Sequence, residues 1–363
     1  MHELGAGGDE LWLGDGVRRR DVRERVDRAG WSYRKKVVIA GAKIAASLTD
    51  FPVAVSLSAD PELTRGARPD GADLFFTSAN GVKLSHEIER FDSASGALVA
   101  WVGIPSLSPG ADAELYLYYG NATAADQQDA PGVWTNGFVA VRHLSQMTGD
   151  TLDSTANGNR GTTNGPTTGV PGILGPAYDF DNPDDNVYIG SNATLQVSAI
   201  TLSLWASLDG TPGMNDVWVM IDKRDEATDY ADYTLTIGPH ATVDRRLDFG
   251  FFTTAWDSNT SNTTLPLTTW SYAAVTYTPG LGIDFYENGV PDGHVNDNAA
   301  LRFTANRPLR LSRPSNLNFG GFDGRMDEAR IARVGRSAGW LATEYNNQRD
   351  PASFFSLSVE EHR

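Results

Sequence analysis

Short segments in which apolar and polar residues alternate follow one another along most of the chain after residue 30. Val53, Val55 and Leu57, for example, lie on one face of an extended strand, because successive side chains of a strand point to opposite sides. Turn signals such as Asn80-Gly81 separate these segments. Apolar positions recur at helical spacing in residues 337–347. The pattern predicts an all-β protein with a single helix near the end of the chain.

The predicted strands are divided between two domains, because 363 residues exceed what one typical core accommodates. Residues 31–121 predict an antiparallel β-sandwich, and residues 134–363 predict a double-sheet jelly roll. Residues 122–133, which include Pro131-Gly132, are expected to be the linker between them. Residues 1–30 are rich in charge, and we expect a leader that is disordered or not native.

Two adjacent acids, Asp327 and Glu328, lie within one predicted strand at residues 321–331. One of them should face the core, where an unpaired carboxylate is costly. Either Arg325 or Arg330 neutralises it, or the strand lies near a sheet edge, or the acid binds a cation.

The composition excludes several classes of protein. A net charge of −16 argues against nucleic-acid binding, and the absence of cysteine excludes disulfides and thiolate metal sites. No apolar run is long enough to insert into a membrane. Although no signal peptide is visible at the start of the chain, we expect the parent protein to be extracellular or attached to the cell surface.

Several motifs of the second domain are similar to those of a known family. They are Val141-Arg142-His143-Leu144, the polar residues 153–162, Thr201-Leu202-Ser203-Leu204-Trp205, Phe285-Tyr286-Glu287-Asn288-Gly289 and residues 321–331. Together they resemble bacterial laminin-G-like domains, which have a concanavalin A-like jelly-roll fold. In the first domain, Asp70-Gly71-Ala72-Asp73 and residues 115–121 resemble a β-sandwich of unknown function that commonly precedes such a jelly roll.

The resemblance implies a structural calcium ion between the early polar loop and the strand that contains the Asp-Glu pair. Calcium prefers carboxylate and carbonyl oxygens, so the expected ligands are Asp153 and Asp327, together with Asp181. The alternative is that these acids cap turns through hydrogen bonds to the backbone.

Carbohydrate binding is the leading functional hypothesis. Trp256 begins the polar segment Trp256-Asp257-Ser258-Asn259, where packing gives little reason for an indole ring, and an exposed ring can stack on a sugar. The other residues expected to bind the glycan are Asp257, Tyr233, Arg224 and His240. The alternative for each aromatic residue is packing in the core.

The sequence contains no recognisable catalytic motif, and the question of an enzyme stays open. It lacks the alternating acids of jelly-roll glucanases, a Gly-x-Ser-x-Gly elbow and a His-Glu-x-x-His motif. A metal-assisted hydrolase or polysaccharide-active enzyme, with a site built from jelly-roll loops, is the first alternative. A passive adhesion or spacer protein is the second.

Overall fold

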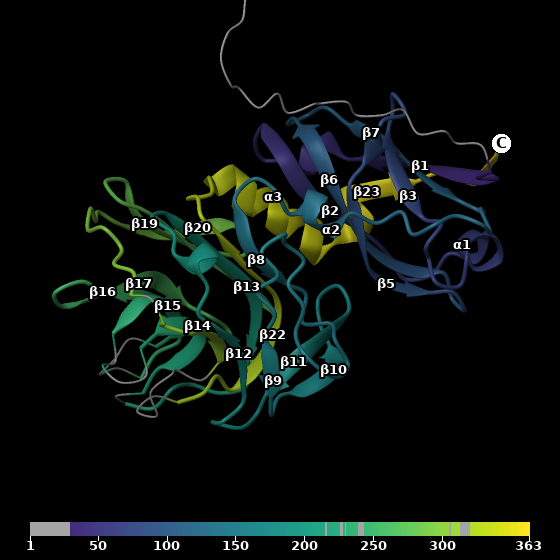
Figure 1. The fold of residues 1–363 in the computed structure, drawn as a ribbon. Coiled ribbons are helices and arrows are strands. Elements are labelled where there is room, and N and C mark those ends of the chain that lie inside the picture. The colour runs from purple at the N-terminus through teal and green to yellow at the C-terminus, as the bar shows by residue number, and fades with distance from the viewer. Residues whose placement is uncertain are drawn as a thin grey trace, which may run out of the picture.

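The computed structural model describes residues 30–214, 216–225, 228, 230–238, 243–304, 306–312 and 320–363. In these residues the chain forms two β lobes, and helix α3 (Ala338–Arg349) lies between them (Figure 1). The all-β prediction is confirmed, and so is the helix expected over residues 337–347. The expected leader lies outside the described residues except for Gly30.

The N-terminal lobe is a sandwich of two antiparallel sheets. Its elements are β1 (Tyr33–Ile39), η1 (Gly41–Lys43), β2 (Leu48–Leu57), α1 (Pro61–Gly66), β3 (Phe75–Ser78), β4 (Lys83–Leu84), β5 (His86–Asp92), β6 (Ala97–Leu107), β7 (Ala113–Tyr119), α2 (Ala130–Val133), β23 (Phe355–Leu357) and β24 (Glu361–His362). One sheet has the order β23-β1-β7-β3-β4, with β24 also paired to β1, and the other has the order β2-β6-β5.

The first and last strands of the described chain are neighbours in this lobe. Val37 of β1 pairs with Leu357 of β23, and Tyr33 pairs with His362 of β24. Strands β23 and β24 therefore complete the N-terminal sheet and not the jelly roll. The sequence could not indicate this, because a short apolar strand does not specify its partner. The boundaries at residues 121 and 133 stay predictions.

The second lobe is a jelly roll of two sheets. Its elements are β8 (Phe138–Arg142), β9 (Thr162–Asn164), β10 (Thr167–Pro171), β11 (Pro176–Phe180), β12 (Asn186–Gly190), η2 (Ala193–Leu195), β13 (Ile200–Leu208), β14 (Trp218–Arg224), β15 (Ala231–Ile237), β16 (Arg246–Phe252), β17 (Trp256–Thr264), β18 (Ser271–Thr278), β19 (Gly282–Glu287), β20 (Val290–Val295), β21 (Leu309–Ser312) and β22 (Gly324–Ala332).

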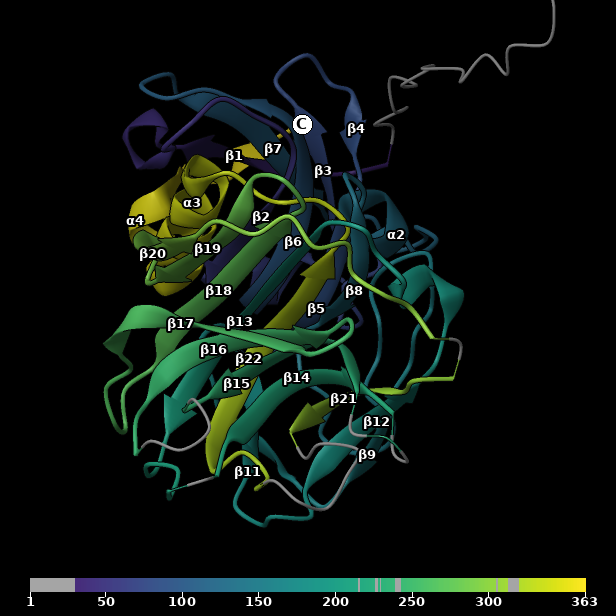
Figure 2. The ribbon, with the colours of Figure 1, turned by 90° about the vertical axis from the view of Figure 1, so that its left-hand side faces the viewer.

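We call the two jelly-roll sheets the inner sheet and the outer sheet. The inner sheet has the order β10-β11-β22-β13-β18-β19-β20, with β8 also paired to β22, and it faces the N-terminal lobe. The outer sheet has the order β17-β16-β15-β14-β21-β12-β9 (Figure 2). Helix α3 is followed by the short helix α4 (Pro351–Phe354), which leads the chain back to the N-terminal lobe.

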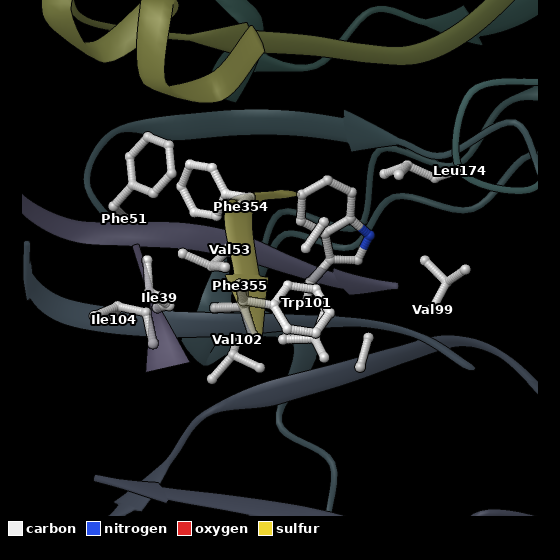
Figure 3. Packing of buried hydrophobic residues seen from close by; sticks show 14 of the residues in the cluster. Ile39, Phe51, Val53, Val99, Trp101, Val102, Ile104, Leu174, Phe354 and Phe355 are labelled. Carbon is white, nitrogen blue, oxygen red and sulfur yellow. The ribbon is translucent and has the colours of Figure 1, made fainter. Parts of the chain in front are cut away.

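The inner sheet is covered on both faces. Leu204 of β13 packs into the core between the two jelly-roll sheets, whereas its neighbour Trp205 belongs to the cluster formed with the N-terminal lobe. Figure 3 shows part of the cluster formed with the N-terminal lobe. This cluster contains Leu174 of the jelly roll, Trp101 of β6 and Phe354 of α4. The core of the N-terminal lobe therefore extends across the contact between the lobes, and the jelly roll has a second core between its own two sheets.

Candidate functional site

One face of the outer sheet points away from the inner sheet, and we call it the distal face. Phe249 and Phe251 of β16 are buried in the jelly-roll core, so Gly250 between them lies on the distal face. The same alternation places Thr234 of β15 and Arg310 of β21 on this face, because their neighbours along each strand are core residues.

Residues from neighbouring strands are in register across the distal face. The row consists of Tyr188, Arg310, Asp222, Thr234, Gly250 and Ser258. Because neighbouring strands lie about 4.8 Å apart, this row spans about 24 Å. Its middle is buried, since Asp222 and Thr234 are 1% and 3% exposed, and its two ends are open.

An exposed aromatic group, which we call the aromatic platform, lies at the β17 end of the row. Trp256 is 40% exposed, and the guanidinium carbon of Arg224 lies 4.8 Å from the centre of its ring. Phe252 is in register with Trp256 and stacks on Tyr230, with 3.6 Å between the ring centres. The platform consists of Arg224, Tyr230, Phe252 and Trp256.

The ring of Trp256 lies over the sheet close to Gly250. A Cβ atom at Gly250 would lie 3.6 Å from Cζ3 of Trp256 and 3.4 Å from Cγ2 of Thr234. A second exposed ring stands at the other end of the row, where Tyr188 is 41% exposed and Arg310 lies 4.9 Å from its ring centre. Each end of the row thus presents an exposed aromatic ring next to an arginine.

A buried acid also lies on the distal face. Burial raises the pKa of Asp248 to about 6, although Ser258 and Arg246 act in the opposite direction. The Ser258 hydroxyl donates to both carboxylate oxygens of Asp248, at 2.9 and 2.7 Å.

The structure brings together two of the five residues predicted to bind a glycan, Trp256 and Arg224. Asp257 points to the other side of β17, where it accepts a hydrogen bond from Asn259 at 2.6 Å and shares one with Asp297. Tyr233 is fully buried in the jelly-roll core, with its hydroxyl donating to the carbonyl of Leu195, so the prediction that it contacts a ligand is wrong. His240 lies outside the described residues.

The three predicted calcium ligands do not form one group within the described residues. The carboxylate of Asp153 accepts hydrogen bonds from the backbone amides of Val141, Thr155 and Asn159, so it caps its own loop. Asp327 is 1% exposed and accepts from the amide of Ile173 at 2.8 Å.

Asp181, the third predicted ligand, is exposed and has other acids nearby. Burial raises the pKa of Asp323, and the charges of Asp209, Asp179 and Asp181 raise it further. Of the three predicted ligands, Asp181 is therefore the one placed among carboxylates on an accessible surface.

Both acids of the Asp327-Glu328 pair lie in the contact with the N-terminal lobe, because β22 contains a bulge. Between Asp327 and Arg330 the register with β13 shifts, so two residues of β22 face one residue of β13. Glu328 occupies the bulge with a φ of 53°, which breaks the alternation of side chains. The prediction places one acid in the core, whereas both acids are buried here, each 1% exposed. Glu328 pairs with Arg330 at 2.6 Å, as the arginine alternative anticipated.

His143 lies at the centre of a buried polar group between the lobes. Its Nδ1 atom is 2.9 Å from Oε1 of Glu328 and 3.5 Å from Oε2 of Glu89. Its Nε2 atom is 3.3 Å from Oε2 of Glu87. We call the whole group the interlobe cluster, and its members are Glu87, Glu89, His143, Asp327, Glu328, Arg330 and Glu344.

Arg330 connects the interlobe cluster to helix α3. It donates to Glu328 at 2.6 Å and to Glu344 of α3 at 2.8 Å. Its guanidinium carbon lies 4.5 Å from the ring centre of Trp101 and 4.8 Å from that of Trp134. One fully buried cation thus contacts strand, helix and N-terminal lobe at once.

The surroundings within the interlobe cluster raise the pKa values of His143, Glu89 and Asp327, which favours the protonated form of each group. Burial lowers the pKa of His143, but the charges of Glu328, Glu89 and Glu87 outweigh burial and raise it well above its usual value. Burial raises the pKa of Glu89 to about 7, with the attraction of His143 opposing and the repulsion of Glu328 adding to it. Burial, followed by repulsion from Glu328 and Glu89, also raises the pKa of Asp327.

Sequence reasoning missed Glu87, Glu89 and His143 as members of a site. Glu87 and Glu89 are two positions apart in β5, a spacing that places two side chains on one face of a regular strand. That spacing was an available signal, but their partner Glu328 is 185 positions from His143, and nothing in the sequence connects them.

Comparisons with known proteins support the two-part architecture. Residues 180–342 match the concanavalin A-like lectin/glucanases superfamily, and residues 70–159 match a domain of unknown function (DUF2341). The resemblance stated from the sequence is confirmed. A region of the chain therefore matches concanavalin A-like domains, and the region before it matches a domain whose role is not established. No curated protein matches the chain.

Solved structures show distant similarity to this chain. Domain 4 of the extracellular arabinanase AbnA from Geobacillus stearothermophilus, solved with arabinotriose, is 15% identical over 58% of this chain and 98% of its own, with a TM-score of 0.46. The binding domain of Paraclostridial Mosquitocidal Protein 1 is 13% identical over 58% of this chain and 52% of that chain, with a TM-score of 0.46. Likenesses this weak carry no functional argument.

Among the described residues, no helix has the length and apolarity needed to cross a membrane.

Proposed function

We propose that this chain is a carbohydrate-binding module and that its ligand lies along the distal face of the outer sheet. The observation that carries the proposal is the aromatic platform, where Trp256 and Tyr230 are 40% and 39% exposed on an otherwise well-packed sheet. Exposed aromatic rings of this kind offer flat apolar surfaces to the C–H faces of sugars, while their neighbours supply hydrogen-bond donors.

The positions of the two exposed ends favour a chain of sugars over a single one. Trp256 and Tyr188 stand near opposite ends of a row about 24 Å long at roughly 4.8 Å per strand. Arg310 stands beside Tyr188 and can orient sugar hydroxyl groups, whereas Arg224 is 3% exposed, pairs with Asp222 and supports the ring of Trp256. A polysaccharide long enough to span the buried middle of the row would contact both rings at once.

A glycan array followed by titration of the best polysaccharide tests this function. We expect Trp256→Ala to weaken binding about thirtyfold, equivalent to about 2 kcal/mol, as is typical when a central aromatic contact is lost. The control is Leu281→Ala, because Leu281 is 72% exposed on the hairpin between β18 and β19 of the inner sheet. Absence of binding to any glycan, or equal affinity of Trp256→Ala and Leu281→Ala, would contradict the proposal. Measuring released reducing sugar in the same samples tests the alternative of a polysaccharide-active enzyme.

We propose calcium stabilisation of the jelly roll as part of this function, with Asp181 as the predicted ligand that retains an accessible position. Mutual repulsion among Asp179, Asp181, Asp209 and Asp323 is what a bound divalent cation would relieve. Calcium should raise the melting temperature, and a chelator should reverse the rise. Identical melting curves with and without calcium would contradict this part.

We also propose that the parent protein acts outside the cell or at its surface, where polysaccharides are encountered. Fractionation of the producing cells tests this, and recovery of the protein in the cytoplasmic fraction would contradict it.

A further inference from the structure

We infer that Glu89, His143 and Glu328 form a binding site for one divalent transition-metal ion, such as Mn²⁺ or Zn²⁺, that joins the two lobes. The three residues come from β5, from the residue after β8 and from β22. One ligand atom of each lies within 4.8 Å of the others. This site is separate from the calcium ligands predicted from the sequence, and it does not depend on glycan binding.

The distances suit a common ion. Two atoms that bind one ion at about 2.1 Å each lie within about 4.2 Å of each other. Nδ1 of His143 meets that condition with Glu328 at 2.9 Å and with Glu89 at 3.5 Å. The site therefore needs only small side-chain adjustments to close around the ion.

Each ligand is held by a further hydrogen bond, as the ligands of metal sites usually are. Nε2 of His143, the nitrogen that would face away from the ion, lies 3.3 Å from Glu87. Trp101 donates to Glu89 at 2.8 Å, and Arg330 donates to Glu328 at 2.6 Å. These contacts fix the orientation of the imidazole ring and of both carboxylates before any ion arrives.

The balance of charge supplies an independent argument. The interlobe cluster contains five acids, Glu87, Glu89, Asp327, Glu328 and Glu344, against two basic groups, His143 and Arg330. An excess of acid is costly where burial removes water. A divalent cation adds positive charge at the place where the three acids Glu89, Asp327 and Glu328 meet.

An entry path exists on the side of Glu89. A cavity of about 720 Å³ is lined by Glu89 and Arg90 of β5, by Ser145 and by residues 169–176 of the hairpin between β10 and β11. The Glu89 side chain is 2% exposed, so an ion would pass from this cavity to its carboxylate through a local movement of side chains. One imidazole nitrogen with carboxylate oxygens suits Mn²⁺, Fe²⁺ or Zn²⁺ better than Ca²⁺, which prefers oxygen ligands alone.

The test uses the full chain, stripped with a chelator and then loaded with MnCl₂ or ZnCl₂. After desalting, we expect about one ion per chain by atomic emission, as for a single closed site. Glu89→Gln, which preserves shape, should weaken binding about tenfold or more, and so should His143→Gln. The matched control is His294→Gln, because His294 is an exposed histidine 2.7 Å from Asp284 on the inner sheet.

The absorption bands of bound Co²⁺ report directly on the ligands, and they should change in Glu89→Gln and stay the same in His294→Gln. If His143→Gln fails to fold, Glu89→Gln decides the question alone. Two results would overturn the inference. The first is that the chain retains no ion after desalting, in which case the cluster is held together by protons alone. The second is that Glu89→Gln binds metal as tightly as the unaltered chain.

Discussion

Replacing Arg330 with methionine removes a buried cation that links β22, helix α3 and the rings of Trp101 and Trp134. The variant loses hydrogen bonds of 2.6 Å to Glu328 and 2.8 Å to Glu344, and both carboxylates stay buried without this partner. Removing one partner of a buried ion pair costs about 3–5 kcal/mol, because an uncompensated charge is left behind. That loss is large against the total stability of a typical domain, about 5–15 kcal/mol.

Urea denaturation followed by tryptophan fluorescence measures this loss, since Trp101 and Trp134 lie against Arg330. The matched control is Arg325→Met in the same strand. Arg325 is 40% exposed and lies 3.3 Å from Asp179, so its removal should cost no more than about 1 kcal/mol. Because one of the two hydrophobic clusters contains residues of both lobes, we also expect a single unfolding transition. An Arg330→Met variant that loses no more stability than Arg325→Met would refute the reasoning.

Two further predictions follow from buried acids and from strand pairing. Folding raises the pKa of Asp248 to about 6, so this group's contribution to stability is complete below its ordinary pKa and is lost as the pH rises through 6. In urea titrations between pH 4 and pH 7, Asp248→Asn should abolish about 2–3 kcal/mol of that decline, and an unchanged pH profile would contradict the assignment. Deleting residues 355–363 removes β23 and β24, and hydrogen exchange should then show loss of protection in β1. Unchanged protection of β1 would show that the C-terminal strands are dispensable.

The strands and the helix could be predicted because their signals are local. Alternation identified the strand containing Val53 and Val55, and helical spacing identified α3. The prominence of Trp256 was also visible in the sequence, since an indole in a polar stretch has little reason to be buried. Arg224 was also named, but the sequence does not show that it meets Trp256. The two residues come together because β14, β15, β16 and β17 are successive neighbours in the outer sheet.

The remaining features depend on contacts between distant segments. The bulge at Glu328 reverses the alternation that assigned one acid to the core, and a single residue with positive φ has no clear sequence signal when it is not glycine or asparagine. Tyr233 was misassigned because alternation gives two faces of a strand but does not say which face is buried. The interlobe cluster needs the two lobes to be packed together before its members meet.

The location of a bound polysaccharide tests the central claim most directly. Hydrogen–deuterium exchange of the full chain, with and without the best ligand from the glycan array, compares the protection of every strand. The account predicts that protection increases in β14, β16 and β17 around Trp256 and Arg224, with little change in β18 and β19 of the inner sheet. Protection confined to the inner sheet or to the N-terminal lobe would contradict the assignment of the distal face as the glycan-binding surface.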